Sequence, residues 1–121
     1  MGKIKETSIN FENKTYLTAE CSEMFAISLI RGQWTLIICC RLSHGKMRFS
    51  ELKRYIPNIT ERMLTLQLRQ MEGNRLITRT VYAEVPPRVE YELTPIGAEL
   101  IPVLHLLGSW GEKYKKKIGK S

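Results

Sequence analysis

Residues 49–73, FSELKRYIPNITERMLTLQLRQMEG, decide the fold of this chain. Phe49, Leu52 and Ile56 have helical spacing, and Pro57 disfavours the helical conformation in the residue before it. The sequence therefore predicts a short helix that ends before Pro57, followed by a tight turn over residues 57–59.

Thr60 opens the second half of this stretch. It is a predicted helix N-cap, because its hydroxyl can accept a hydrogen bond from an N–H of the first turn. Over residues 61–73, Leu64, Leu68 and Met71 fall on one apolar stripe at helical spacing. Two helices joined by a short turn, the second capped and basic, predict a helix-turn-helix.

Two apolar segments precede this unit. Residues 24–30 predict a short helix with Ser22 as its N-cap and Gly32 at its end. Residues 33–43 are apolar on nearly all sides and predict a buried central helix. Residues 1–17 show no convincing period, and we interpret them as an N-terminal arm.

The segments after the helix-turn-helix predict a β-hairpin and a last helix. Residues 76–82 and 88–93 alternate β-branched and aromatic residues, and residues 83–87 form a proline-stiffened tip. Thr94 caps the last helix, with Pro95 in its first position. An apolar stripe runs along that helix and has more members than a small core needs. It predicts a dimer interface, with ordinary core as the alternative. Its members are Ile96, Leu100, Val103, Leu104, Leu107, Trp110 and Tyr114.

This order predicts an α+β fold that is mostly α: a winged helix-turn-helix with extra N- and C-terminal helices. The length of 121 residues suits one compact domain, which we place at residues 18–121 after the arm. No apolar run reaches the roughly 20 residues of a membrane span, and the N-terminus lacks the apolar core of a signal peptide. We therefore expect a cytoplasmic protein with no membrane partner.

The net charge of +7 is concentrated in the middle of the chain. Residues 41–79 carry nine basic and three acidic side chains, which indicates a polyanion-binding element. In a recognition helix, the N-terminal and outward residues contact base edges in the major groove. Candidate base contacts are Thr60, Arg62, Thr65 and Arg69; candidate phosphate contacts are Arg48, Lys53 and Arg54; and the wing adds Arg79 and Arg88 near the minor groove. The alternative is a charged face on a winged-helix module that binds another protein.

Several short motifs occur in a characteristic order along residues 20–112. They are GQW at 32–34, RFSEL at 48–52, IT at 59–60, MLT at 63–65, LR at 68–69, PPRVEY at 86–91, LTPIG at 93–97 and WG at 110–111. With these motifs the chain resembles the HxlR family of bacterial transcriptional regulators. The resemblance implies a homodimer whose extra N- and C-terminal helices form the dimer interface. It also implies that this dimer binds double-stranded DNA, here on a pseudo-palindromic operator, as repressor or activator. The interface residues it favours are Leu100, Val103, Leu104, Leu107 and Trp110.

Cys21 is the candidate sensor of a signal. It lies just ahead of a predicted helix, where the helix dipole favours a thiolate over a thiol. It also falls where proteins of the HxlR family typically carry a cysteine, which in some members senses oxidants or electrophiles such as quinones and aldehydes. The family usually has proline next, whereas this chain has Ser22. A half-buried structural cysteine and a small-molecule effector in the dimer groove remain open alternatives.

The other cysteines offer no metal site or catalytic centre. Cys39 and Cys40 are adjacent, so they point about 100° apart on a helix and should not pair. Cys40 and His44 could share a helical face, but zinc needs three or four ligands and only distant side chains could complete the set. The chain has no Asp to orient a histidine base. We therefore expect no metal, no cofactor and no enzymatic activity.

Overall fold

A computed structural model describes residues 21–119 of the chain and divides it after Gly32 into two units. In the first unit the described helix is α2 (Ser22–Ile30). Its N-cap is Cys21, in extended conformation, so the sequence prediction of Ser22 as the cap was wrong by one residue. The predicted N-terminal arm, residues 1–17, lies outside the described residues.

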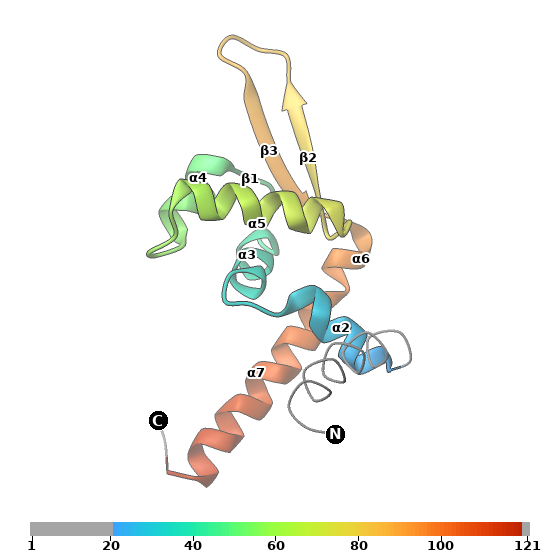
Figure 1. Cartoon of the computed structure of the whole chain (residues 1–121). Helices are drawn as coiled ribbons and strands as arrows, with labels where there is room; N and C mark the ends of the chain where they lie inside the picture. The colour runs from blue at the N-terminus through green and yellow to red at the C-terminus, as the bar shows by residue number, and fades with distance from the viewer. Residues whose placement is uncertain (1–20, 120–121) are drawn as a thin grey trace, which may run out of the picture. The chain divides into compact units, whose positions relative to one another are not determined.

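The second unit, from Gln33 onward, is mostly helical and carries a small antiparallel sheet (Figure 1). Its elements are α3 (Thr35–Leu42), β1 (Met47–Arg48), α4 (Phe49–Tyr55), α5 (Glu61–Gly73), β2 (Ile77–Tyr82), β3 (Arg88–Leu93), α6 (Pro95–Ala98) and α7 (Leu100–Lys117). Helix-turn-helix α4–α5 followed by hairpin β2–β3 is a winged helix, which confirms the predicted fold class.

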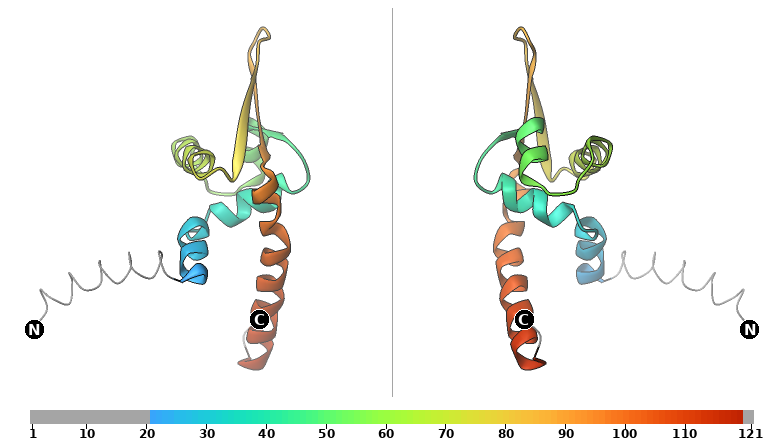
Figure 2. Two further views of the ribbon diagram at one scale, coloured as in Figure 1. Left: turned by 90° about the vertical axis from the view of Figure 1, so that its right-hand side faces the viewer. Right: turned by 90° about the vertical axis from the view of Figure 1, so that its left-hand side faces the viewer.

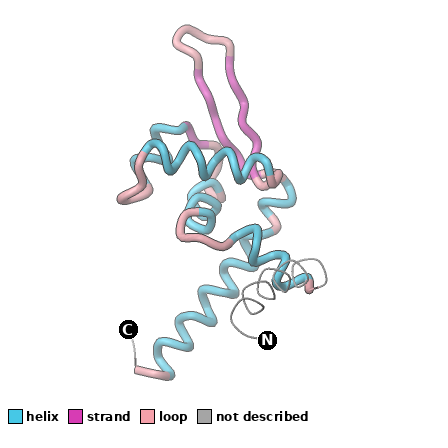
Figure 3. Tube along the Cα trace, in the orientation of Figure 1, coloured by secondary structure: helices cyan, strands magenta, loops and turns pink. Residues whose placement is uncertain are grey.

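The sheet has the strand order β1-β3-β2. Strand β1 was not predicted, because two residues are too few to show an alternating pattern. It pairs Met47 with Tyr91 and Arg48 with Glu90, and so ties the start of α4 to the wing. Strands β2 and β3 continue as a two-stranded ribbon beyond the helices of this unit (Figures 2 and 3).

The core lies where α3, α4 and α5 meet the base of the sheet. Ile38, Leu52 and Leu64 are fully buried there, and each such side chain contributes about 1.5–3 kcal/mol on burial. Gln67 of α5 donates a 2.7 Å hydrogen bond to the hydroxyl of the buried Thr35 on α3. These contacts hold α5 in place on the central helix, which leaves its other face for function.

The predicted last helix is two helices. Thr94 accepts a 3.0 Å hydrogen bond from the N–H of Gly97, with Pro95 in the first turn, so the predicted cap is confirmed. The helix is interrupted at Glu99 and restarts as α7. Pro102 explains the break, because it has no N–H for the carbonyl four residues earlier and its ring clashes with that carbonyl.

No single helix in residues 21–119 is long and apolar enough to cross a membrane. The helices α2 and α3 reach the required length and apolar composition only when they are counted together.

Candidate nucleic-acid interface

Helix α5 presents a polar face that carries two arginines opposite its core face. Its start is fixed by the predicted cap, since the Thr60 hydroxyl accepts a 3.1 Å hydrogen bond from the N–H of Met63. The predicted apolar stripe of Leu64, Leu68 and Met71 is buried. The side chains of Arg62, Leu66, Arg69 and Gln70 are exposed, and that of Thr65 is half-buried. The cap and the stripe together fix which side chains of α5 can meet a partner.

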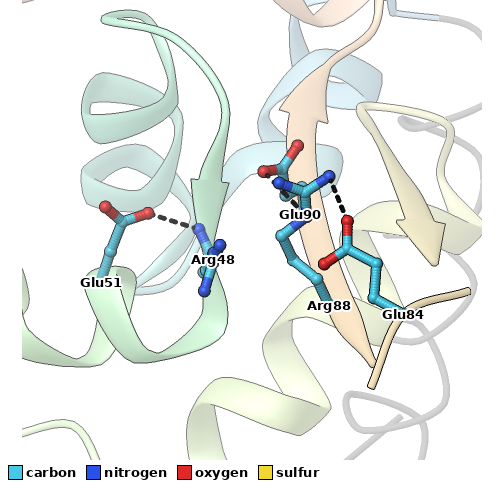
Figure 4. Close-up of polar contacts among 5 residues, drawn as sticks. All are labelled: Arg48, Glu51, Glu84, Arg88 and Glu90. Atoms are coloured by element: carbon cyan, nitrogen blue, oxygen red, sulfur yellow. Dashed lines mark hydrogen bonds and ion pairs between the residues drawn. The ribbon is translucent and has the colours of Figure 1, made fainter. Parts of the chain in front are cut away.

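Helix α4 brings further cations beside α5. Its N-terminus is capped by Glu51, whose carboxylate accepts a 2.8 Å hydrogen bond from the N–H of Arg48 (Figure 4). Because this bond uses only the backbone of Arg48, its exposed guanidinium remains available. Lys53, half-buried, and Arg54, exposed, occupy the last turn of α4.

Six of the nine predicted contact residues are basic groups without an acidic partner. Within residues 21–119, no carboxylate lies within 4.0 Å of their charged nitrogens. They are Arg48, Lys53, Arg54, Arg62, Arg69 and Arg79. Cations that fold without internal neutralisation keep their full attraction for an external polyanion.

Arg88, the other wing residue that the sequence predicted near the minor groove, differs from this group because two carboxylates lie close to its guanidinium. Its Nη2 lies 3.1 Å from Glu84 Oε2 and its Nε lies 3.8 Å from Glu90 Oε2 (Figure 4). Its guanidinium also stacks 4.0 Å from the ring centroid of Tyr82. Two carboxylates therefore flank the guanidinium, one from the tip and one from β3. At the tip, the side chain of Val85 is fully exposed. The wing tip is therefore apolar and internally neutralised.

A hollow of about 380 Å³ lies where α5 meets the base of the wing. It joins Thr65 and Arg69 of α5 to Arg79 of β2, which sequence reasoning had placed among the contacts but not together. Thr60 and Arg62 are not among its lining residues, and both are exposed. Sequence reasoning missed three lining residues: Phe49, Glu72 and Tyr91. Tyr91 pairs with Arg79 across the hairpin, so counting the register back from the turn could have found it.

The HxlR-like helix-turn-helix family matches residues 29–118 of this sequence. The chain belongs to the HxlR family. It is similar to an uncharacterized HTH-type transcriptional regulator of Methanothermobacter thermautotrophicus, with 52% identity over 94 residues, 78% of this chain and 72% of the relative. It is similar to regulator YtcD of Bacillus subtilis, with 48% identity over 92 residues, 76% of this chain and 73% of YtcD. This HxlR-family protein is thus a helix-turn-helix transcriptional regulator and not an enzyme.

Among solved structures, the redox regulator HypR in its reduced form resembles this HxlR-family chain. The two share 42% sequence identity with a TM-score of 0.73, over 78% of this chain and 94% of HypR.

Cys21 of this HxlR-family regulator is a half-buried thiol at the N-cap of α2. Its Sγ donates a 3.4 Å hydrogen bond to the Glu23 carboxylate. The N–H of Glu23 and the Cys21 thiol lower the pKa of Glu23, so this carboxylate is charged beside the sulfur. The sequence prediction did not foresee this carboxylate beside the Cys21 sulfur. Ser22 occupies the first helical position of α2, where proline is also well tolerated. The chain can therefore begin a helix at this residue although it has serine where the family usually has proline.

The neighbouring thiols on α3 have opposite environments. Cys39 is buried in the core, and burial together with the neighbouring Cys40 raises its pKa to about 11, so it stays a protonated thiol at neutral pH. Cys40 is exposed, and both are free, as the sequence predicted. In the part of the chain that the structure describes, no three His, Cys, Asp or Glu side chains gather as metal ligands.

Helix α7 of the HxlR-family chain carries a half-exposed apolar face. Val103, Leu107, Trp110 and Tyr114 are 50–62% exposed and lie on one side of the helix, and the rings of Trp110 and Tyr114 stack with centroids 5.4 Å apart. Leu104 points into the core at 9% exposure. Leu104, which the sequence predicted as an interface residue, thus belongs to the core of its own chain, and Leu100 packs partly against the same core.

Proposed function

We propose that this regulator is a homodimer that binds double-stranded DNA sequence-specifically at a pseudo-palindromic operator. Each copy would place α5 in the major groove of one half-site, with half-sites about 34 Å apart. The observation that carries the proposal is a group of six basic side chains on β1, α4, α5 and β2 that have no carboxylate within 4.0 Å among residues 21–119. They accompany an N-capped α5 with an exposed face. In this proposal residues 18–121 act as one functional domain with α7 as its dimerisation helix.

The position of each cation suggests its role. Arg62, in the first turn of α5, and the capping Thr60 lie at the end of the helix that reads base edges. Lys53 and Arg54 lie in the last turn of α4, and Arg48 at its start, where they suit backbone phosphates. Base contacts carry sequence preference, whereas phosphate contacts carry affinity and its dependence on salt.

The test is a competition gel shift with a duplex selected from a random pool and a scrambled duplex of equal length. We expect the Arg62→Ala variant to lose about 1–3 kcal/mol on the selected duplex and to relax the preference at one base position. We expect the Lys53→Ala variant to weaken both duplexes by the same factor and to reduce the salt slope by about 1.

Two results of this assay would contradict the proposal. If no selected duplex competes better than scrambled DNA at physiological salt, sequence-specific regulation is wrong and a winged-helix module for protein contacts becomes the better interpretation. If the two variants lose the same share of binding on both duplexes, the division between base and phosphate contacts is wrong.

We further propose that Cys21 senses oxidants or electrophiles. The proposal is supported by the half-buried thiol at a helix N-terminus and by the similarity to a protein described as a redox regulator. A small molecule bound between the two copies would be the other route for a signal.

For this role we expect a thiol oxidant to change the operator affinity of the wild type and to leave a Cys21→Ser variant unaffected. Cys40→Ser is the matched control, because Cys40 is the exposed thiol and the buried, protonated Cys39 should not react. The readout is the Kd for the selected duplex before and after oxidation. Equal responses in wild type and Cys21→Ser would exclude Cys21 as the sensor.

A further inference from the structure

The hollow between α5 and the wing has the charge of an oxyanion site. Its two guanidinium groups come from different elements, Arg69 from α5 and Arg79 from β2. Within residues 21–119 neither has a carboxylate within 4.0 Å. Guanidinium groups bind phosphate oxygens through paired, charge-assisted hydrogen bonds. Two of them around one concavity point to an anionic ligand.

Hydroxyl groups add uncharged donors to the same hollow. Tyr91 is only 8% exposed, yet its hydroxyl takes part in none of the side-chain hydrogen bonds among residues 21–119. Of the buried side-chain nitrogen and oxygen atoms in residues 21–119, the one without a partner is Arg88 Nε, so the Tyr91 hydroxyl reaches solvent. Since Tyr91 lines the hollow together with Thr65, the two hydroxyls can serve a ligand there.

The hollow lies away from the base-reading end of α5. Arg69 comes seven residues after Arg62, which is about 10 Å further along the helix axis. The base contacts of a recognition helix come from its N-terminal residues, while the sugar-phosphate backbone borders the groove. Helix α5 contacts strand β2 beside the hollow, so a ligand there touches recognition helix and wing at once.

We propose that this hollow binds one backbone phosphate of the DNA duplex. Arg69 and Arg79 hold its oxygens from two sides, and the hydroxyls of Thr65 and Tyr91 complete the donor set. The inference rests on the proposed DNA binding and gives Thr65 and Arg69 a phosphate in place of the base edges that the sequence predicted. Glu72 also lines the hollow, and its carboxylate repels the same phosphate.

The test measures Kd and its salt dependence for the selected and the scrambled duplex. Arg69→Gln and Arg79→Gln should each weaken both duplexes by the same factor, about tenfold, and lower the salt slope by about 1. Because both bind one phosphate, the double variant should lose less than the product of the two single losses. Glu72→Gln should tighten both duplexes. Lys117→Gln, at the far end of α7, is the matched control and should change neither by more than about twofold.

A series of duplexes, each with a neutral methylphosphonate in place of one backbone phosphate, locates the phosphate that the hollow binds. When the methylphosphonate replaces the phosphate that the hollow binds, at one position in each half-site, the Arg79→Gln variant should bind this duplex as tightly as the wild type does. A change of base preference in Arg69→Gln, an unchanged salt slope or no gain from Glu72→Gln would each overturn the phosphate site while wild-type DNA binding stands. If instead the wild type shows no preference for the selected duplex, the proposed specificity fails. The Kd values of the variants for the scrambled duplex then still test the phosphate site.

Discussion

A Leu107→Glu variant is expected to be a monomer at concentrations where the wild type is a dimer. Leu107 is 50% exposed in the middle of the apolar face of α7, between Val103 and Trp110. A carboxylate placed there would have to be buried without a partner in the proposed dimer, which costs several kcal/mol for each copy. The measurement is molar mass by sedimentation or light scattering.

The same variant should bind the operator about 10²- to 10⁴-fold more weakly than the wild type. A dimer holds its second half-site at a high effective concentration, and a monomer loses that advantage. Ser109→Glu is the matched control, because it puts the same charge on the same helix at an exposed position away from the apolar face. If Leu107→Glu stays dimeric with wild-type affinity, the α7 face is not the interface.

Gly97→Ala is expected to destabilise the fold by about 3 kcal/mol. A Cβ at this position would lie 2.2 Å from the carbonyl oxygen of Leu76. That oxygen belongs to the backbone and accepts a 3.0 Å hydrogen bond from the N–H of Thr94, so it cannot move without loosening the base of the wing. Overpacking a rigid contact typically costs 1–3 kcal/mol, and the strained hydrogen bonds add to it.

Urea unfolding monitored by circular dichroism measures this loss. Gly108→Ala is the matched control, because a Cβ there meets no atom within 4 Å and alanine favours the helix by about 1 kcal/mol. If the free energy of unfolding of Gly97→Ala lies within about 0.5 kcal/mol of the wild-type value, the backbone at the base of the wing can shift to accept the added methyl group, and the prediction is wrong.

The parts of the fold that local rules specify could be predicted from the sequence. The caps at Thr60 and Thr94 and the buried stripe of α5 follow from residue types within a few positions of one another. Strand β1 was missed because it depends on pairing with β3. The interruption at Glu99 was missed although Pro102 is a local signal for it, because the long apolar stripe favoured one continuous helix.

The candidate site divides in the same way. The exposed face of α5 follows from helical periodicity, so the placement of Arg62 and Arg69 could be predicted. The environment of Arg88 depends on its cross-strand neighbours and on the return of the tip to bring Glu84 close. The burial of Leu104 depends on which side of α7 meets α3. Pairing and docking between distant segments leave no periodic trace in a single sequence.

The hydroxyl of Thr94 donates to the carbonyl oxygen of Arg75 at 2.7 Å and caps α6, so the base of the hairpin is bonded to the chain on both sides of it. At the tip, Glu84 bonds, among the described residues, only to the ends of the two strands: its carboxylate pairs with Arg88 at 3.1 Å and its N–H donates to the carbonyl oxygen of Tyr82 at 2.9 Å. Insertions or deletions in residues 83–87 are therefore expected to leave the scaffold intact. In the proposed complex, the reach of the wing along DNA could therefore change in evolution by loop length alone, while α5 keeps its position.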